Sequence, residues 1–184
     1  VLATERATAR EVEAGGRVVD NTTAFRMNAD VPLVVPEING SLVSPETRLV
    51  ACPNCSAIAL VMALAPIHRA VPIERVVVTT FQSVSGAGKE LLAELDSQVA
   101  AAKGEAPKPG VLPKPIAFNC YPVIGDVRES GFTKEEEKII EETRKILGSP
   151  ALGVVPTAVR VPTRVGHALS VNVEMSSALP VEEA

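Results

Sequence analysis

The chain is poor in the features that mark several classes of protein. Its 184 residues include only three cysteines and two histidines, and the net charge is −4. An odd, small number of cysteines does not make a disulfide scaffold, so we expect reduced thiols and a cytoplasmic location. No basic run exceeds two residues, so we expect no nucleic-acid partner. No stretch reaches the roughly 20 apolar residues of a membrane span, and we expect no membrane partner either.

Both ends of the sequence are typical of a truncated chain. Val1 opens directly in a helix-like run, without the basic-then-apolar order of a signal peptide. Pro180 and the acidic residues after it resemble the first turn of a helix that does not develop. We therefore expect a piece of a longer polypeptide.

Periodicity and turn residues predict alternating helices and strands. We expect helices over residues 2–14, 55–69, 89–103 and 133–148, strands over 17–21, 48–52, 74–86, 152–162 and 166–176, and loops over 22–48 and 104–115. The helix over 55–69 is apolar on nearly every face, which predicts that it is buried. This order indicates an α/β protein: an α+β catalytic domain with a mixed, largely antiparallel sheet, preceded by the tail of a separate α/β unit.

The stretch Cys52-Pro-Asn-Cys55 admits several interpretations. It could be a redox pair at the start of a helix, where the helix dipole favours a thiolate. A zinc site would need further ligands, and only Cys120, His68 and His167 remain. The two thiols could also simply fill a buried strand–helix junction. Finally, Cys55 alone could be a nucleophile, with His167, at the start of a strand, as its base.

Other polar residues lie where a substrate site could use them. Gln82 comes near the end of a strand and is followed by small residues that let a ligand approach the backbone. Arg160 lies in a strand and could either bind a substrate or be solvated. Glu135–Glu137 open a helix, where a solvated acidic face is the usual explanation, and Lys138 follows them. Arg26 carries no strong signal of its own.

Taken together, several stretches resemble aspartate-semialdehyde dehydrogenase. They occur in that family's order and cover almost the whole chain: VVDNTTAFRMNADVPLVVPEIN, PNCSAIALVMAL, TTFQSVSGAGKE, FNCYPVIG, FTKEEEKIIEETRKIL and TAVRVPTRVGHALSV. The PNC before an apolar helix and the RVP…GH pair are the specific elements. The resemblance implies a catalytic domain of the glyceraldehyde-3-phosphate-dehydrogenase-like C-terminal type and part of a Rossmann-type domain.

The resemblance also implies roles for individual residues. Cys55 would be the nucleophile and His167 the acid/base. Gln82 would orient the acyl intermediate, Arg160 would grip the substrate α-carboxylate, and Glu135 would face the substrate ammonium.

The same resemblance implies the phosphate and cofactor contacts. Arg26 and Lys138 would hold the phosphate, and Asn54 would belong to the substrate-binding set. Ser85 and Gly86 would lie near the nicotinamide end of NADP, and no metal is implied. The expected reaction is NADPH-dependent reductive dephosphorylation of L-aspartyl 4-phosphate to L-aspartate 4-semialdehyde, in lysine, threonine and methionine biosynthesis, through a cysteine thioester.

Two departures from the family pattern shape the expectations. The position of Cys52 is usually asparagine, which favours the single-nucleophile interpretation. The N-terminal Gly-rich nucleotide loop and the C-terminal helix of the family have no counterpart. We therefore expect residues 1–54 to be a remnant of the NADP-binding domain and residues 55–184 to be a truncated catalytic and dimerisation domain. We expect this chain alone to be inactive and to bind NADPH weakly.

The resemblance implies a homodimer or a dimer of dimers, with a small-molecule substrate. Two alternatives stay open. One is an enzyme like N-acetylglutamyl-phosphate reductase, whose cysteine typically follows glycine rather than asparagine. The other is a non-catalytic dimerisation module of the same fold.

Overall fold

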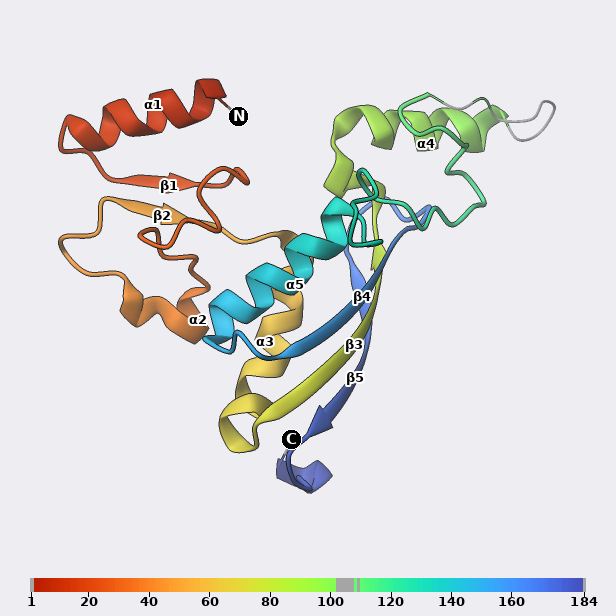
Figure 1. Ribbon diagram of the computed structural model, residues 1–184. Coiled ribbons are helices and arrows are strands. Elements are labelled where there is room, and N and C mark those ends of the chain that lie inside the picture. The colour runs from red at the N-terminus through yellow and green to blue at the C-terminus, as the bar shows by residue number, and fades with distance from the viewer. Residues whose placement is uncertain (1, 102–107, 109, 184) are drawn as a thin grey trace. The chain divides into compact units, whose positions relative to one another are not determined.

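The computed structural model describes residues 2–101, 108 and 110–183 (Figure 1). The end of the helix expected over 89–103, and part of the loop expected over 104–115, lie outside the described residues. The chain forms two compact units. The first comprises Val1–Arg75, Lys138–Gly153 and Glu174–Ala184, and the second comprises Val76–Glu137 and Val154–Val173.

The first unit begins with a helix and a small parallel sheet. Its elements are α1 (Leu2–Glu13), β1 (Val18–Asp20), α2 (Pro36–Asn39), a 3-10 turn (Gly40–Leu42), β2 (Leu49–Ala51) and α3 (Cys55–Ala70). After α1 the chain turns at Gly15, whose φ of +85° suits glycine. β1 and β2 run parallel, with Val19 opposite Val50. The short helix α2 lies within the loop-rich region expected over 22–48, and Pro36 fixes a helical φ at its first position.

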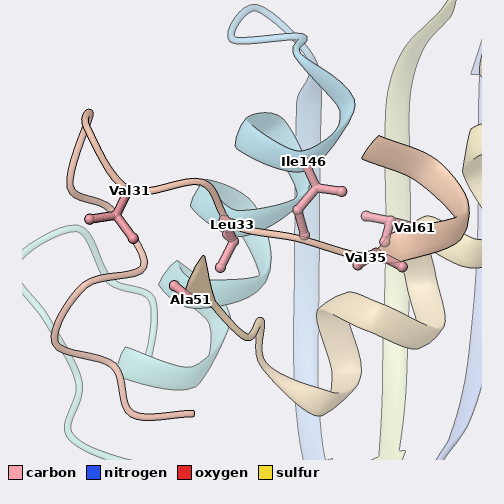
Figure 2. Close-up of a cluster of buried hydrophobic side chains, with 6 residues drawn as sticks. All are labelled: Val31, Leu33, Val35, Ala51, Val61 and Ile146. Atoms are coloured by element: carbon pink, nitrogen blue, oxygen red, sulfur yellow. The ribbon is translucent and has the colours of Figure 1, made fainter. Parts of the chain in front are cut away.

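The core of the first unit joins segments that are distant in the sequence. Figure 2 shows its six buried side chains: Val31, Leu33, Val35, Ala51, Val61 and Ile146. One side of α3 is buried through residues such as Leu60 and Leu64. The prediction that this helix is buried is confirmed for one side only, because on the other side Met62 is 42% exposed and Ala59, Ala63 and Pro66 are also exposed.

The second unit is built on a three-stranded sheet in the order β4-β3-β5. Its strands are β3 (Ile73–Gln82), β4 (Gly153–Arg160) and β5 (Ala168–Met175), whose first or last residues extend into the first unit. A 3-10 turn (Val84–Ala87) and α4 (Lys89–Ala101) follow β3, and α5 (Lys134–Leu147) precedes β4. From Lys138 on, α5 belongs to the first unit, as does a final 3-10 turn over Val181–Glu183. The α/β class is confirmed.

The two ends of α5 lie where the sequence predicted them. Thr133 and Glu136 form the predicted capping box at the start of α5: the Glu136 carboxylate accepts the Thr133 backbone N–H at 2.7 Å, and the Thr133 hydroxyl accepts the Glu136 N–H at 3.3 Å. Gly148, with φ of +64°, ends the helix. A second small core lies beneath α4 and contains Val84, Leu91, Leu95, Ile116 and Ala117.

The strands β3 and β4 bury alternate residues along most of their length. In β3, Val76 and Val78 are fully buried, whereas Phe81 is 41% exposed. In β4, Ala158 is buried and Val155 is 39% exposed. One apolar side of these strands is therefore left partly open. Among the described residues, no helix has the length and apolarity needed to cross a bilayer.

Candidate active site

The predicted site residues fall into two groups, one in each unit. The group in the first unit surrounds the start of α3, where Asn54 is the N-cap and Cys55 is the first helical residue. The Asn54 side-chain oxygen accepts the backbone N–H groups of Ser56 at 2.9 Å and Ala57 at 3.3 Å. Cys55 is exposed, and Cys52 is partly exposed. The turn thus places an exposed Cys55 at the N-terminus of α3.

The position of this turn follows from the parallel pair β1 and β2. Both strands end at the same edge of their sheet, where ligands bind in open α/β folds. Directly after β2, the Cys52 backbone N–H donates to the Asp20 carbonyl oxygen at 2.7 Å, at the end of β1. The loop that follows β1 carries Arg26.

Arg26 is buried in the first unit. Its Nη1 donates to the Glu142 carboxylate at 3.0 Å, and its Nη2 donates to the Asn21 carbonyl oxygen at 3.1 Å. The other Glu142 oxygen accepts the Asn54 backbone N–H at 2.5 Å. Burial raises the pKa of Glu142, against the opposing effects of the Asn54 N–H, the Arg26 charge and the Lys138 charge. Lys138 is half-buried and lies one helical turn before Glu142.

The group in the second unit gathers at the end of β3. Gln82 is 1% exposed, and its Nε2 lies 3.3 Å from Thr80 Oγ1 and 3.4 Å from Glu135 Oε1. The next residue, Ser83, donates its backbone N–H to Nδ1 of His167 at 3.1 Å. Because Nδ1 accepts this bond, the proton of the neutral ring is assigned to Nε2.

Arg160 approaches the same segment from the end of β4. It is 6% exposed, and its Nη1 donates to the Ser83 carbonyl oxygen at 2.8 Å. The interpretation of Arg160 as a solvated residue is therefore wrong. A Cβ on Gly86 would lie 3.1 Å from Cε1 of His167 and 3.3 Å from Nη1 of Arg160. A side chain at position 86 would therefore require His167 and Arg160 to move by a few tenths of an ångström.

The two glutamates at the start of α5 have different surroundings. Glu136 is occupied by the capping box and by the Ala158 backbone N–H, which its Oε1 accepts at 2.9 Å. Glu135 lies beside Gln82, and its charge acts on His167. Of the two, Glu135 is the one placed with the other predicted site residues.

The environment of His167 favours the neutral ring. Burial lowers the pKa of His167, and the positive charge of Arg160 lowers it further. A hydrogen bond with the Gly166 backbone and the negative charge of Glu135 oppose this shift. The net direction is downward, so His167 is mainly neutral at pH 7.

Sequence reasoning missed Ser83 and Glu142. Ser83 contacts His167 through both its N–H and its hydroxyl, which also lies 3.1 Å from the Ser85 hydroxyl. Its only signal was its place directly after Gln82. The sequence indicated a role for Glu142 even more weakly, only through its position one helical turn after Lys138. Among the described residues, no cluster of three or more potential metal ligands is present.

Comparison with known proteins extends this description. A family model described as semialdehyde dehydrogenase, dimerisation domain, matches residues 64–184. The chain belongs to the semialdehyde dehydrogenase family. A second model of the family, described as semialdehyde dehydrogenase, NAD binding domain, matches residues 3–44.

Relatives within the family carry a more specific name. The chain is 46% identical over 174 residues to aspartate-semialdehyde dehydrogenase 2 of Vibrio cholerae, with 93% of this chain and 52% of the relative covered. It is 44% identical over 172 residues to aspartate-semialdehyde dehydrogenase of Bacillus subtilis, with 89% and 50% covered. The chain thus spans about half the length of the curated relatives it matches. The resemblance stated from the sequence is confirmed.

Solved structures agree with these relatives. The crystal structure of aspartate semialdehyde dehydrogenase II from Vibrio cholerae matches with a TM-score of 0.93 and 44% identity, over 99% of this chain and 55% of that one. The same protein complexed with ASA matches equally well. A probable aspartate-semialdehyde dehydrogenase from Pseudomonas aeruginosa matches with a TM-score of 0.86 and 26% identity, over 96% and 54%.

Proposed function

We propose that the protein containing this chain is an NADP-dependent aspartate-semialdehyde dehydrogenase that interconverts L-aspartyl 4-phosphate and L-aspartate 4-semialdehyde. One observation carries the proposal: the Vibrio cholerae relative solved with ASA shares the fold and 44% of the residues over nearly the whole chain. The proposal includes a cytoplasmic location and a place in lysine, threonine and methionine biosynthesis.

The chemistry starts at Cys55. Its thiolate attacks the acyl carbon of aspartyl phosphate, the carbon–oxygen bond to phosphate breaks, and inorganic phosphate leaves. The product is a thioester on Cys55. Hydride addition at the thioester carbon then expels the thiolate and yields the aldehyde. The exposure of Cys55, at the first residue of α3, supports this role because it leaves the sulfur accessible to a substrate.

The second unit supplies side chains for the substrate and for protons. His167, whose pKa is lowered mainly by burial and whose Nδ1 accepts the Ser83 N–H, would exchange a proton with the reacting groups through Nε2. Gln82 would orient the acyl oxygen by its amide. Arg160 would bind the α-carboxylate through its planar guanidinium, and Glu135 would face the ammonium group.

The nicotinamide end of the cofactor is proposed to lie near Ser85 and Gly86. Gly86, next to Ser85, has no Cβ, and a Cβ at this position would crowd His167 and Arg160. NADP would supply or accept the hydride when bound. We propose Ser85 and Gly86 as its contacts.

Assembly into dimers is also part of the proposal. The partly open apolar side of the second unit's strands, with Phe81 and Val155, supplies an apolar surface suitable for a second copy. The name of the family model that matches residues 64–184 supports this use. The division of the chain into residues 1–54 and 55–184, and a further dimer of dimers, stay predictions.

A substrate comparison tests the proposed function. The protein containing this chain should oxidise aspartate semialdehyde in a reaction that requires both phosphate and NADP. N-acetylglutamate semialdehyde and NAD should each support at least 100-fold lower efficiency. Preference for N-acetylglutamate semialdehyde would favour the related reductase, and the absence of both activities in a folded protein would favour a non-catalytic module.

A further inference from the structure

Glu142 is a buried carboxylate with no role in the proposed reaction so far. The residue is only 1% exposed, whereas its neighbour Glu141 lies on the surface of the same helix. Burying a carboxylate is unfavourable unless hydrogen bonds and opposite charges compensate it. Its place in the interior of α5 therefore indicates a task that an apolar side chain could not perform.

The two oxygens of Glu142 hold two different parts of the chain. Oε2 accepts the backbone N–H of Asn54 at 2.5 Å, and Oε1 accepts Nη1 of Arg26 at 3.0 Å. Asn54 in turn caps the helix that begins with Cys55. One side chain thus fixes both the turn that presents the sulfur and the arginine in the loop after β1.

The helix α5 also holds the backbone of that loop. Nζ of Lys145 donates to the carbonyl oxygens of Arg26, Asn28 and Val31 at 2.8, 2.7 and 2.9 Å. Residues three apart lie on the same face of a helix, so Glu142 and Lys145 both hydrogen-bond to the loop after β1 from the same face of α5. The position of the Arg26 guanidinium is therefore set by α5.

Arg26 retains donors for an anion. A guanidinium has five N–H groups, and the hydrogen bonds to Glu142 and Asn21 use two of them. The Nε atom of Arg26 is buried and has no hydrogen-bond partner among the described residues. An unsatisfied buried donor is unfavourable, and an oxyanion would satisfy it with a charge-assisted hydrogen bond.

We propose that Glu142 is a positioning residue for phosphate recognition: it holds Arg26 in place for the phosphate and fixes the Asn54–Cys55 turn at the same time. This inference rests on the proposed function, since it assigns the ligand of Arg26 to the phosphate released in that reaction. Glu142 also interacts electrostatically with both Arg26 and Lys138, the two cations proposed for the phosphate.

Neutralising Glu142 changes phosphate affinity in opposite directions depending on whether the residue positions Arg26 or only contributes a negative charge. If Glu142 acted only as a negative charge, its neutralisation would leave the cations less compensated, and phosphate would bind more tightly. If it positions Arg26, neutralisation releases the guanidinium and phosphate binds more weakly. Glu142→Gln distinguishes the two cases, because it retains an oxygen for the Asn54 N–H but presents N–H groups to the Arg26 donor.

The test compares Glu142→Gln with Glu141→Gln, which removes the same charge from the exposed face one residue away. In the protein containing this chain, Glu142→Gln should raise the KM for phosphate about tenfold or more. The KM for aspartate semialdehyde, and the rate of Cys55 alkylation, should change less than threefold. Glu141→Gln should leave the KM for phosphate within twofold of its original value or lower it slightly.

A second variant and a binding measurement complete the test. Glu142→Asp keeps the charge but is one methylene shorter, so it cannot span both partners and should raise the KM for phosphate at least threefold. Calorimetry with inorganic phosphate gives the same comparison without turnover, and it decides the proposal even if the protein does not oxidise aspartate semialdehyde. Unchanged or tighter phosphate binding in Glu142→Gln, no phosphate binding by the unaltered protein, or an equal loss in every kinetic parameter would overturn the positioning role.

Discussion

Replacing Arg160 by lysine tests whether a planar, two-point contact recognises the substrate carboxylate. Arg160 is almost completely buried, and its Nη1 donates to the Ser83 carbonyl oxygen at 2.8 Å. Its backbone pairs with that of Tyr121 through two hydrogen bonds of 2.8 Å, which the substitution leaves in place. The variant therefore changes the side chain at a fixed backbone position and keeps the positive charge.

The expected loss follows from the contacts that lysine cannot make. An ammonium group does not reproduce the parallel N–H pair that a guanidinium presents to a carboxylate. One lost charge-assisted hydrogen bond corresponds to about 1.5–3 kcal/mol, and the contact with the Ser83 carbonyl adds about 0.5–1.5 kcal/mol. Together these give roughly 2–4.5 kcal/mol, or roughly a 30- to 2000-fold fall in kcat/KM.

The assay is steady-state oxidation of aspartate semialdehyde by the protein containing this chain, with phosphate and NADP at saturation. Arg164→Lys is the matched control, because the Arg164 side chain is 60% exposed and pairs with Asp96 at the surface. We expect the control to stay within twofold of the original efficiency. A fall of less than threefold in Arg160→Lys would refute the carboxylate-binding role.

Other perturbations probe the same groups. Gly86→Ala should lower kcat/KM about tenfold or more, because the new Cβ would lie 3.1 Å from the His167 ring; an unchanged value would show that the ring can shift at no cost. NMR titration should place the pKa of His167 below its ordinary value of about 6.5, since burial disfavours the charged ring, and Glu135→Gln should lower it further by removing a negative charge. An upward shift in Glu135→Gln would contradict this account. Mild peroxide should inactivate the protein reversibly through a Cys52–Cys55 disulfide that dithiothreitol reopens, and peptide mapping without that linkage would leave Cys52 a passive neighbour.

Local sequence signals predicted most of the elements and most of the candidate site. The capping box of Thr133 and Glu136 and the stop at Gly148 depend on residues a few positions apart, so they are visible without a structure. The same holds for Cys55 directly after the helix-capping Asn54.

The rest depends on contacts between distant parts of the chain. The Glu142–Asn54 hydrogen bond joins residues 88 positions apart, so a helix that reads as a solvated acidic face conceals a buried carboxylate. The exposed side of α3, at Met62, was mispredicted for a related reason: an apolar helix does not reveal which of its faces the rest of the protein covers. The contact of Ser83 with His167 could not be predicted either, because it depends on how β5, which begins directly after His167, packs near the end of β3.

The most direct measurement of the role of Cys55 is mass spectrometry of the protein containing this chain after incubation with aspartyl phosphate in the absence of a nicotinamide cofactor. The account predicts an aspartyl thioester on the peptide that carries Cys55, with one phosphate released for each adduct, and neither product in Cys55→Ser. An adduct on another residue, or undiminished phosphate release by Cys55→Ser, would contradict it.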